Sequence, residues 1–196
     1  MSHSAPAPDP DALPPWRPLL RAARQREGRA PQARWLQLAS VAADGTPRLR
    51  TLVFRGWGGP AALDLLSDGR SAKAAELARE PAVELCWLLP RARCQFRLRG
   101  RCLSLPQQQE QRQRQHHWQA LSGAGRALWS WPPPGEPLDQ QADFPPFLPP
   151  EAPLPAHLLL LRIGLDQVEL LELGDHPHRR RRWRQRSGWQ QEDLNP

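Results

Sequence analysis

The fold is decided by residues 34–57, which read RWLQLASVAADGTPRLRTLVFRGW. Two apolar-rich runs, Arg34–Ala42 and Pro47–Trp57, flank the short segment Ala43-Asp44-Gly45-Thr46. An Asp-Gly pair between two such runs is typical of a β-hairpin turn. In the second run, side chains alternate between two faces, as they do along a strand. The stretch therefore predicts an antiparallel hairpin.

Strand-like segments continue beyond this hairpin. Further strands are expected over residues 62–67, 82–89, 93–105, 157–163, 167–173 and 179–186, and helices over 16–28, 72–79 and 106–121. Most connections are shorter than the dozen or more residues that a parallel crossover needs. The pattern favours an α+β protein that is mainly β, with an antiparallel barrel and peripheral helices. Gly100, inside one strand, indicates a bulge or a close backbone approach.

Composition limits the organisation of the chain. Its 196 residues suit one domain, residues 16–196, after a Ser/Ala/Pro-rich tail, residues 1–15, that we expect to be disordered. A Pro-rich excursion covers residues 131–155. No apolar run approaches the ~20 residues of a membrane span, and the tail lacks the features of a secretory signal. Three cysteines spaced eight apart fit neither a zinc pair nor a disulfide framework, so a cytoplasmic location is expected.

One lysine stands out, because 26 of the 27 basic residues are arginine. Lys73 ends the stretch Ser67-Asp68-Gly69-Arg70-Ser71-Ala72-Lys73, where a strand meets a helix that Ser71 is expected to cap. A compact charge beside hydroxyls at a helix start suits a phosphate group. The candidate anion site consists of Arg50, Arg55, Arg70, Ser71 and Lys73. A solvated basic rim is the alternative interpretation.

Other constellations carry weaker signals. Gln95 and Arg97 share one strand face, which is suited either to a planar heterocycle or simply to solvent. The run from His176 to Arg186 contains six arginines, so a nucleic-acid site is one interpretation and a charged strand the other. His-x-His at 176–178 lacks a third metal ligand, and no metal site is expected. His116 and His117, on a Gln-rich helix, are expected to be exposed. No catalytic triad and no dinucleotide-binding glycine motif is present.

Four segments in order resemble the pyridoxamine 5′-phosphate oxidase-like flavoproteins, in particular their cyanobacterial FMN-binding branch. Residues 47–55 are similar to the family's Arg-x-Val-Leu-Leu-Lys strand, and Ser67–Lys73 to its Ser-Arg-Lys phosphate corner. Gln95–Gly100 resembles its Gln-Val-Arg-Val-x-Gly strand. Residues 167–181, then Trp189 and Leu194-x-Pro196, match its C-terminal signature. Together these segments span residues 34–196.

The resemblance implies a split β-barrel homodimer, Greek-key-like, with FMN at the subunit interface. Arg50 and Arg55, with Thr51, Leu52 and Val53 between them, would flank the flavin, and positive charge there would stabilise its reduced form. Ser67, Ser71 and Lys73 would hold the phosphate end. Gln95 would reach FMN from the partner subunit, and Arg181 would contact it from the last strand pair.

The departures from the family pattern concern mainly the substrate. Ala72 replaces one phosphate arginine, for which Arg70 is the expected substitute, and Leu171 stands where a tryptophan packs near the flavin. The Arg-x-His that grips the vitamin aligns with Pro177-His178-Arg179, and the helical Tyr/Arg/Ser set has no match in residues 107–123. The sequence thus predicts an FMN-binding oxidoreductase of unknown substrate. A non-catalytic flavin carrier or sensor is the alternative, and a nucleic-acid-binding module is a third, less favoured one.

Overall fold

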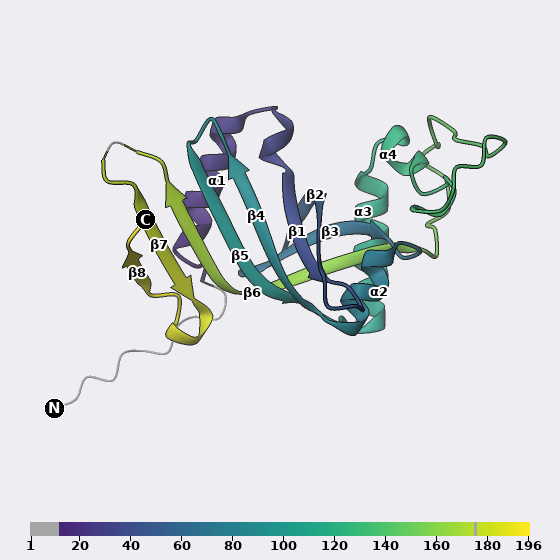
Figure 1. Cartoon of the computed structure of the whole chain (residues 1–196). Coiled ribbons are helices and arrows are strands. Elements are labelled where there is room, and N and C mark those ends of the chain that lie inside the picture. The colour runs from purple at the N-terminus through teal and green to yellow at the C-terminus, as the bar shows by residue number, and fades with distance from the viewer. Residues whose placement is uncertain (1–11, 175) are drawn as a thin grey trace.

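The predicted hairpin forms the first two strands of a closed antiparallel barrel (Figure 1). The computed structural model describes residues 12–174 and 176–196. Strands β1 (Trp35–Val41) and β2 (Pro47–Gly59) pair with Trp35 opposite Val53 and Val41 opposite Pro47. Gly45 has φ 81° in the connecting turn, a conformation that glycine adopts without a Cβ penalty. The hairpin prediction is confirmed. Most of the expected tail, residues 1–11, lies outside the described residues.

Six strands close the barrel and two extend it. The other strands are β3 (Ala62–Asp68), β4 (Ala82–Leu89), β5 (Cys94–Cys102), β6 (Leu158–Glu172), β7 (Arg179–Arg184) and β8 (Gln191–Leu194). The strand order is β3-β2-β1-β4-β5-β6-β7-β8, and pairing of β3 with β6 closes the ring. All pairings are antiparallel, so the predicted split-barrel α+β class is confirmed.

Helices cover the two ends of the barrel (Figure 1). They are α1 (Trp16–Glu27), α2 (Ala72–Arg79), α3 (Gln107–Ala120) and α4 (Gly123–Ala127), with single turns at Pro31–Ala33 and Gln185–Ser187. Along α1, Trp16, Leu20 and Ala23 are buried against the barrel core, which confirms the predicted apolar face. Among the described residues, none of these helices has the length and apolar character needed to cross a bilayer.

Three element predictions are corrected. The expected strands 157–163 and 167–173 form one strand, β6, because Gly164 and Leu165 stay paired with β5 and only Asp166 is left out, at a register shift opposite Arg99 and Gly100. The backbone of β6 passes so close to β5 that a Cβ on Gly100 would lie 2.0 Å from the carbonyl oxygen of Gly164, as expected for a close approach. The last predicted strand ends at Arg184, and both α4 and β8 were missed.

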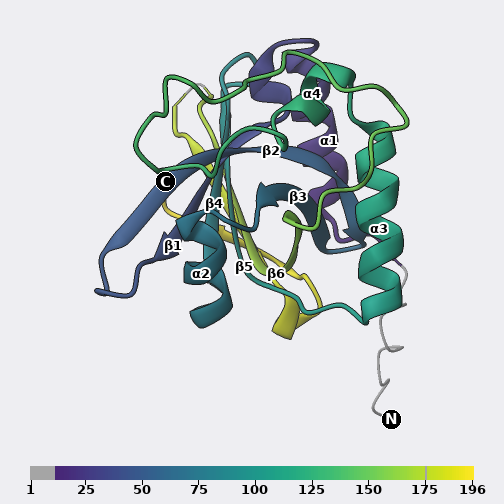
Figure 2. The ribbon, with the colours of Figure 1, turned by 90° about the vertical axis from the view of Figure 1, so that its right-hand side faces the viewer.

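The Pro-rich excursion packs at the α3 end of the barrel. Figure 2 faces this end and shows it looping outward from α4 before the chain returns to β6. A second apolar cluster, containing Leu66, Trp118 and Trp129, lies beneath it. The Trp118 indole N–H donates to the carbonyl of Ala152 at 2.8 Å, and the Leu148 amide donates to Gly123 at 3.0 Å. The excursion therefore has fixed attachments on α3 and α4.

Candidate functional site

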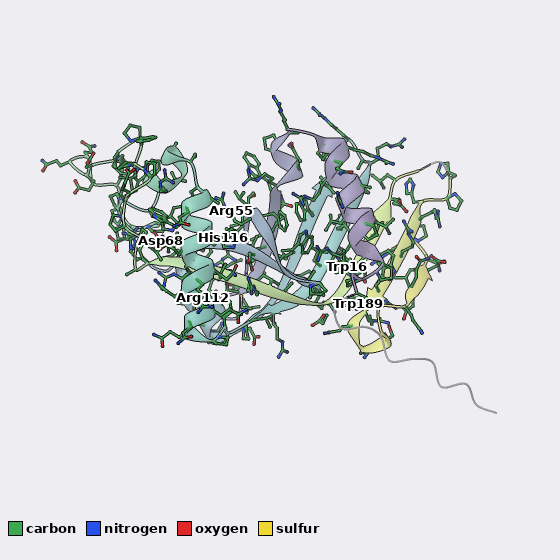
Figure 3. All side chains as sticks on the ribbon, turned by 180° about the vertical axis from the view of Figure 1, so that it is seen from behind. Trp16, Arg55, Asp68, Arg112, His116 and Trp189 are labelled. Carbon is green, nitrogen blue, oxygen red and sulfur yellow. The ribbon has the colours of Figure 1, made fainter. Side chains whose placement is uncertain are left out.

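A cavity of about 460 Å³ lies between the barrel and the excursion. Its barrel side is formed by β2, β3 and the start of α2, and its outer side by the excursion and the residues that precede it. Six of the candidate cofactor residues lie on the barrel side. These are Thr51, Leu52, Val53, Arg55, Ser67 and Lys73. Figure 3 shows Arg55 and Asp68, which also lines the cavity, on the side of the barrel toward the excursion, away from the Trp16–Trp189 end.

The corner after β3 is shaped by the hydrogen bonds of Asp68 and Ser71. The Arg70 amide donates to Asp68 Oδ1 at 2.8 Å, and the Ser71 hydroxyl donates to the Asp68 carbonyl at 2.6 Å. Ser71 is the N-cap residue of α2, as predicted, although its side chain makes no capping hydrogen bond. The hydroxyl instead accepts from Lys73 Nζ at 2.9 Å. This bond directs the lysine ammonium to the cavity.

Lys73 lies in a partly desolvated, electropositive place. Burial, and secondly the charge of Arg50, hold the pKa of Lys73 below its ordinary value of 10.5. Both causes disfavour the charged ammonium, and a bound anion would relieve both. The environment of this lysine therefore favours an anionic ligand.

Two buried polar groups on the cavity wall lack partners. Within residues 12–174 and 176–196, neither the Nε of Arg55 nor the hydroxyl of Ser67 finds a hydrogen-bond partner, and Arg55 forms no ion pair. Burial, and then the neighbouring charge of Arg34, lower the pKa of Arg55. Buried groups of this kind are costly unless a ligand satisfies them. Arg55, Ser67 and Lys73 together form an unfilled set of donors for an anion.

Two other candidate cations are already paired. The Arg50 guanidinium donates to Glu76 Oε2 at 2.6 Å and also to the Ser40 hydroxyl, on the inner side of the corner. Arg70 forms an ion pair with Asp68 at 2.6 Å. Neither arginine lines the cavity. The charge of Arg50 acts on Lys73, but the donors of both arginines are largely occupied.

The remaining two candidates, Gln95 and Arg181, lie elsewhere in this subunit. Gln95 lines a second hollow of about 310 Å³ together with Arg97, Glu169, Leu171 and Arg180. Arg181 forms an ion pair with Glu172 at 2.6 Å, and its neighbour Arg180, not Arg181, lines the hollow. The strand ladders connect the two sites across the outward face of the barrel. Thr51 pairs with Gln37, Gln37 with Cys86, and Cys86 with Arg97.

A buried ionic cluster, which no sequence pattern had indicated, lies between β3, β6 and α3. Arg162 donates two hydrogen bonds to Asp64, each of 2.8 Å, and His117 Nε2 lies 3.0 Å from the same carboxylate. The expectation that His117 is exposed is wrong, since its ring is buried. The signal was absent because the partner, Asp64, lies 53 positions earlier in the chain. The three side chains satisfy one another's hydrogen bonds, so we assign the cluster a role in stabilising the fold.

The arginine run at the end of the chain is largely neutralised. Arg180 pairs with Glu169, Arg181 with Glu172, and Arg182 and Arg184 both pair with Glu192. These contacts are cross-strand ion pairs within the β6–β7–β8 ladder. The run therefore stabilises this ladder and leaves few unpaired cations that could bind the phosphate backbone of a nucleic acid. Among the described residues, no group of three or more His, Cys, Asp or Glu side chains is placed to hold a metal ion.

Comparison with known proteins decides the family. The profile described as pyridoxamine 5′-phosphate oxidase, FMN-binding domain, matches residues 13–106. Pyridoxine/pyridoxamine 5′-phosphate oxidase 2 of Arabidopsis thaliana is 32% identical over 166 residues, which are 81% of this chain and 83% of the relative. The chain belongs to the pyridoxamine 5′-phosphate oxidase family.

Solved structures agree with this assignment. A pyridoxamine 5′-phosphate oxidase-related, FMN-binding protein from Nostoc punctiforme superposes with a TM-score of 0.84 and 36% identity, covering 94% of this chain and all of that one. The resemblance to the cyanobacterial FMN-binding branch is thus confirmed. PhzG from Burkholderia lata, solved with tetrahydrophenazine-1-carboxylic acid, has a TM-score of 0.75 over 92% of this chain and 90% of its own. At 18% identity, its similarity shows the shared fold alone.

The cofactor of this family is FMN, and the cavity fits its chemistry. A phosphate ester needs hydroxyl and cationic donors, and Ser67, Lys73 and Arg55 provide such donors with free valences. The apolar members Leu52, Val53 and Leu66 suit the flat apolar part of a flavin. The unpartnered donors and the apolar lining of this cavity therefore fit the cofactor of the family.

Proposed function

We propose that this protein is an FMN-dependent oxidoreductase whose substrate is not a phosphorylated form of vitamin B6. The observation that carries the proposal is the pair of buried, unpartnered donors, Arg55 Nε and Ser67 Oγ, beside Lys73 in one cavity. They have the character of a preformed phosphate and flavin site. Bound FMN would supply the electron-transfer chemistry, and the side chains would supply binding, orientation and charge.

The side chains have separate roles in this proposal. Lys73, oriented by Ser71, would neutralise the phosphate, and Ser67 would donate its hydroxyl to it. Arg55 would place a fixed positive charge beside the flavin, where it favours the reduced, anionic form. Arg50 would act indirectly, because it is held by Glu76 and affects Lys73 through charge.

The proposed exclusion of the vitamin substrate rests on the substrate-side residues. His178 and Arg179 are exposed, and proline stands at the position of the family's first substrate arginine. Helix α3 offers Gln, Arg and His side chains in place of the family's Tyr/Arg/Ser set. The Arabidopsis relative carries the name of a vitamin oxidase, so this part of the proposal separates this chain from that relative.

We further propose a homodimer in which Gln95 of one subunit reaches the cavity of the other. Large apolar side chains are exposed on the outward faces of β1, β2 and β4: Trp35 at 49%, Leu49 at 69% and Leu88 at 50%. They lie on the same side of the sheet as Thr51 and Gln95, which belong to different hollows. A two-fold axis through this face would bring the second hollow of one subunit toward the cavity of its partner.

The test is an absorbance spectrum of the protein as purified and after FMN titration. We expect flavin bands in the wild type, their loss in Lys73→Glu, and their retention in Arg48→Glu, a charge reversal at an exposed arginine of β2 that does not line the cavity. Photoreduced protein is then mixed with O₂ and candidate acceptors, and rapid reoxidation supports an enzyme over a carrier. A protein that takes up no FMN contradicts the proposal. Efficient oxidation of pyridoxine 5′-phosphate contradicts the substrate exclusion alone.

A further inference from the structure

The excursion forms the outer wall of the flavin cavity. It contributes nine lining residues, among them Trp131, Glu136, Leu138, Asp139 and Phe144. This wall stands opposite Arg55 and Lys73, which line the barrel side. A substrate that approached a flavin held on the barrel side would therefore meet the excursion.

The wall is aromatic and held in place. The ring centroids of Trp131 and Phe144 lie 5.6 Å apart at 71°, an edge-to-face arrangement. The Trp131 indole N–H donates to the Pro145 carbonyl at 3.0 Å, and Arg70 donates to the Trp131 carbonyl at 3.0 Å. Prolines restrict the backbone between these contacts. A rigid surface of rings and prolines is suited to contact a flat apolar ligand.

The charge of the excursion is opposite to that of the rest of the chain. Residues 131–155 contain four acidic residues and no lysine, arginine or histidine, although the whole chain carries a net charge of +7. Two of these acids, Glu136 and Asp139, line the cavity. Arg70, which lies near Glu136, is already paired with Asp68. The outer wall thus presents negative charge to an incoming ligand.

The two sides of the cavity consequently select for different charges. Once the FMN phosphate offsets Lys73 and Arg55, the carboxylates of Glu136 and Asp139 dominate the field at the outer side. An anionic substrate would be repelled there, whereas a neutral or cationic ring would keep its apolar contacts with Trp131 and Leu138.

Building on the proposed function, we propose that the excursion is the specificity element of this enzyme and that it selects an uncharged or cationic planar aromatic substrate over an anionic one. Glu136 and Asp139 set the charge preference. Trp131, Leu138 and Phe144 provide the apolar contact surface.

The experiment uses the full chain loaded with FMN and one ring system in three charge states. The probes are 2-naphthylmethylamine as the cation, 2-naphthylmethanol as the neutral compound and 2-naphthoate as the anion, each titrated by calorimetry at pH 7. We expect the amine and the alcohol to bind and the naphthoate to bind at least about fivefold more weakly.

Two double variants with the same change in charge locate the effect. In Glu136→Gln/Asp139→Asn, the preference for the amine over naphthoate should fall about two- to fivefold, as expected for exposed charges. Asn at 139 retains an acceptor for the Gln141 amide, which donates to Asp139 Oδ1. In Asp143→Asn/Glu151→Gln, which alters the same excursion away from the cavity lining, the preference should not change. Leu138→Arg, at an exposed lining position, should strengthen binding of naphthoate.

The outcomes separate the two proposals. Failure to take up FMN contradicts the proposed function, and with it the inference. If flavin-loaded protein binds naphthoate as tightly as the amine, binds none of the probes, or keeps its charge preference in Glu136→Gln/Asp139→Asn, the inference is wrong and the proposed function stands.

Discussion

Arg55 illustrates how one side chain can be unfavourable for the free protein and favourable for its complex. Its Nε is buried, lacks a partner among the described residues, and lies near the like charge of Arg34. We expect Arg55→Gln to lower FMN affinity about 10- to 100-fold, which corresponds to the loss of charge-assisted hydrogen bonds. The apoprotein should not lose stability, because the variant removes an unpaired, partly buried charge.

This prediction is checked by fluorescence titration of FMN and by thermal unfolding of the apoprotein. Arg34→Gln is the control, since Arg34 is a neighbouring, exposed arginine that does not line the cavity. A large loss of apoprotein stability in Arg55→Gln, with FMN affinity unchanged, would assign Arg55 a purely structural role.

Lys73 makes a prediction about pH. Burial and Arg50 lower the pKa of Lys73 in the free protein, and a bound phosphate would raise it again. FMN affinity should therefore be highest below the pKa of Lys73 in the free protein and should decrease as the pH rises through that pKa. Because this pKa lies below the ordinary lysine value of 10.5, the decrease should begin at a lower pH than for an ordinary lysine. Lys73→Arg should remove this decrease, because arginine stays protonated. Equilibrium titrations of FMN between pH 7 and 10.5 test this, and identical profiles for both proteins would rule out Lys73 as the titrating group.

Arg50 and Arg55 show how much of the candidate site could be predicted from the sequence. The sequence placed Arg50 and Arg55 on one strand as equivalent candidates for an anion. They differ because Glu76, on α2, neutralises Arg50, whereas Arg55 points to the cavity. Lys73 was identified correctly as a residue of this corner, because its uniqueness and its strand–helix position are both readable from the sequence. Arg50 is not free because its partner, Glu76, lies 26 positions away in the sequence, beyond the reach of a local pattern.

At the scale of elements, Asp64 connects β3, β6 and α3. Burial by itself raises the pKa of Asp64, but hydrogen bonds from Arg162 and His117 outweigh it, so the net pKa lies below the ordinary value of 3.8. Asp64→Asn should cost about 3–5 kcal/mol of unfolding free energy, because Arg162 would remain buried without a counter-ion. Glu84→Gln, which breaks more exposed pairs with Arg97 and Arg99, should cost less than about 1 kcal/mol.

The same cluster predicts that the unfolding free energy decreases at acidic pH. Because the folded pKa of Asp64 is depressed, its stabilisation is present above pH 3.8 and is lost as the pH falls through the folded value. Urea unfolding of wild type and Asp64→Asn between pH 3 and 7 measures both effects. Parallel stability profiles for the two proteins would contradict this role for Asp64.

Elements were predicted well where a local pattern defines them and poorly where tertiary contacts do. The hairpin of β1 and β2 follows from alternation and from Asp44-Gly45, which any reader of the sequence can see. Strand β6 was divided in two at residues 164–166, although Gly164 pairs with both Ala62 and Arg101. A Cβ on Gly164 would lie only 2.9 Å from the Leu103 side chain, a tertiary contact that the local pattern does not show. Strand β8 has four residues, and its pairing with β7 defines it more than its own composition does.

At the scale of the whole molecule, the position of Gln95 provides the argument for a second subunit. Within one chain Gln95 lines a hollow separate from the cavity of Lys73, and exposed Trp35 and Leu88 lie on the face between them. Burial of such apolar side chains is the usual driving force of a permanent dimer. If the FMN site is completed across this face, dimerisation and cofactor binding should fail together.

Light scattering of the FMN-loaded wild type should therefore give twice the 22.3 kDa chain mass. Leu88→Arg should shift the protein toward monomer and weaken FMN binding, because it buries a charge beside Trp35 and Gln95. Leu173→Arg, at an exposed leucine just beyond the end of β6, is the control and should remain dimeric. Gln95→Ala should also remain dimeric but bind FMN about two- to tenfold more weakly, as expected for one lost hydrogen bond. A monomeric wild type with bound FMN would show that one subunit suffices, and the site would then have to be completed by the excursion alone.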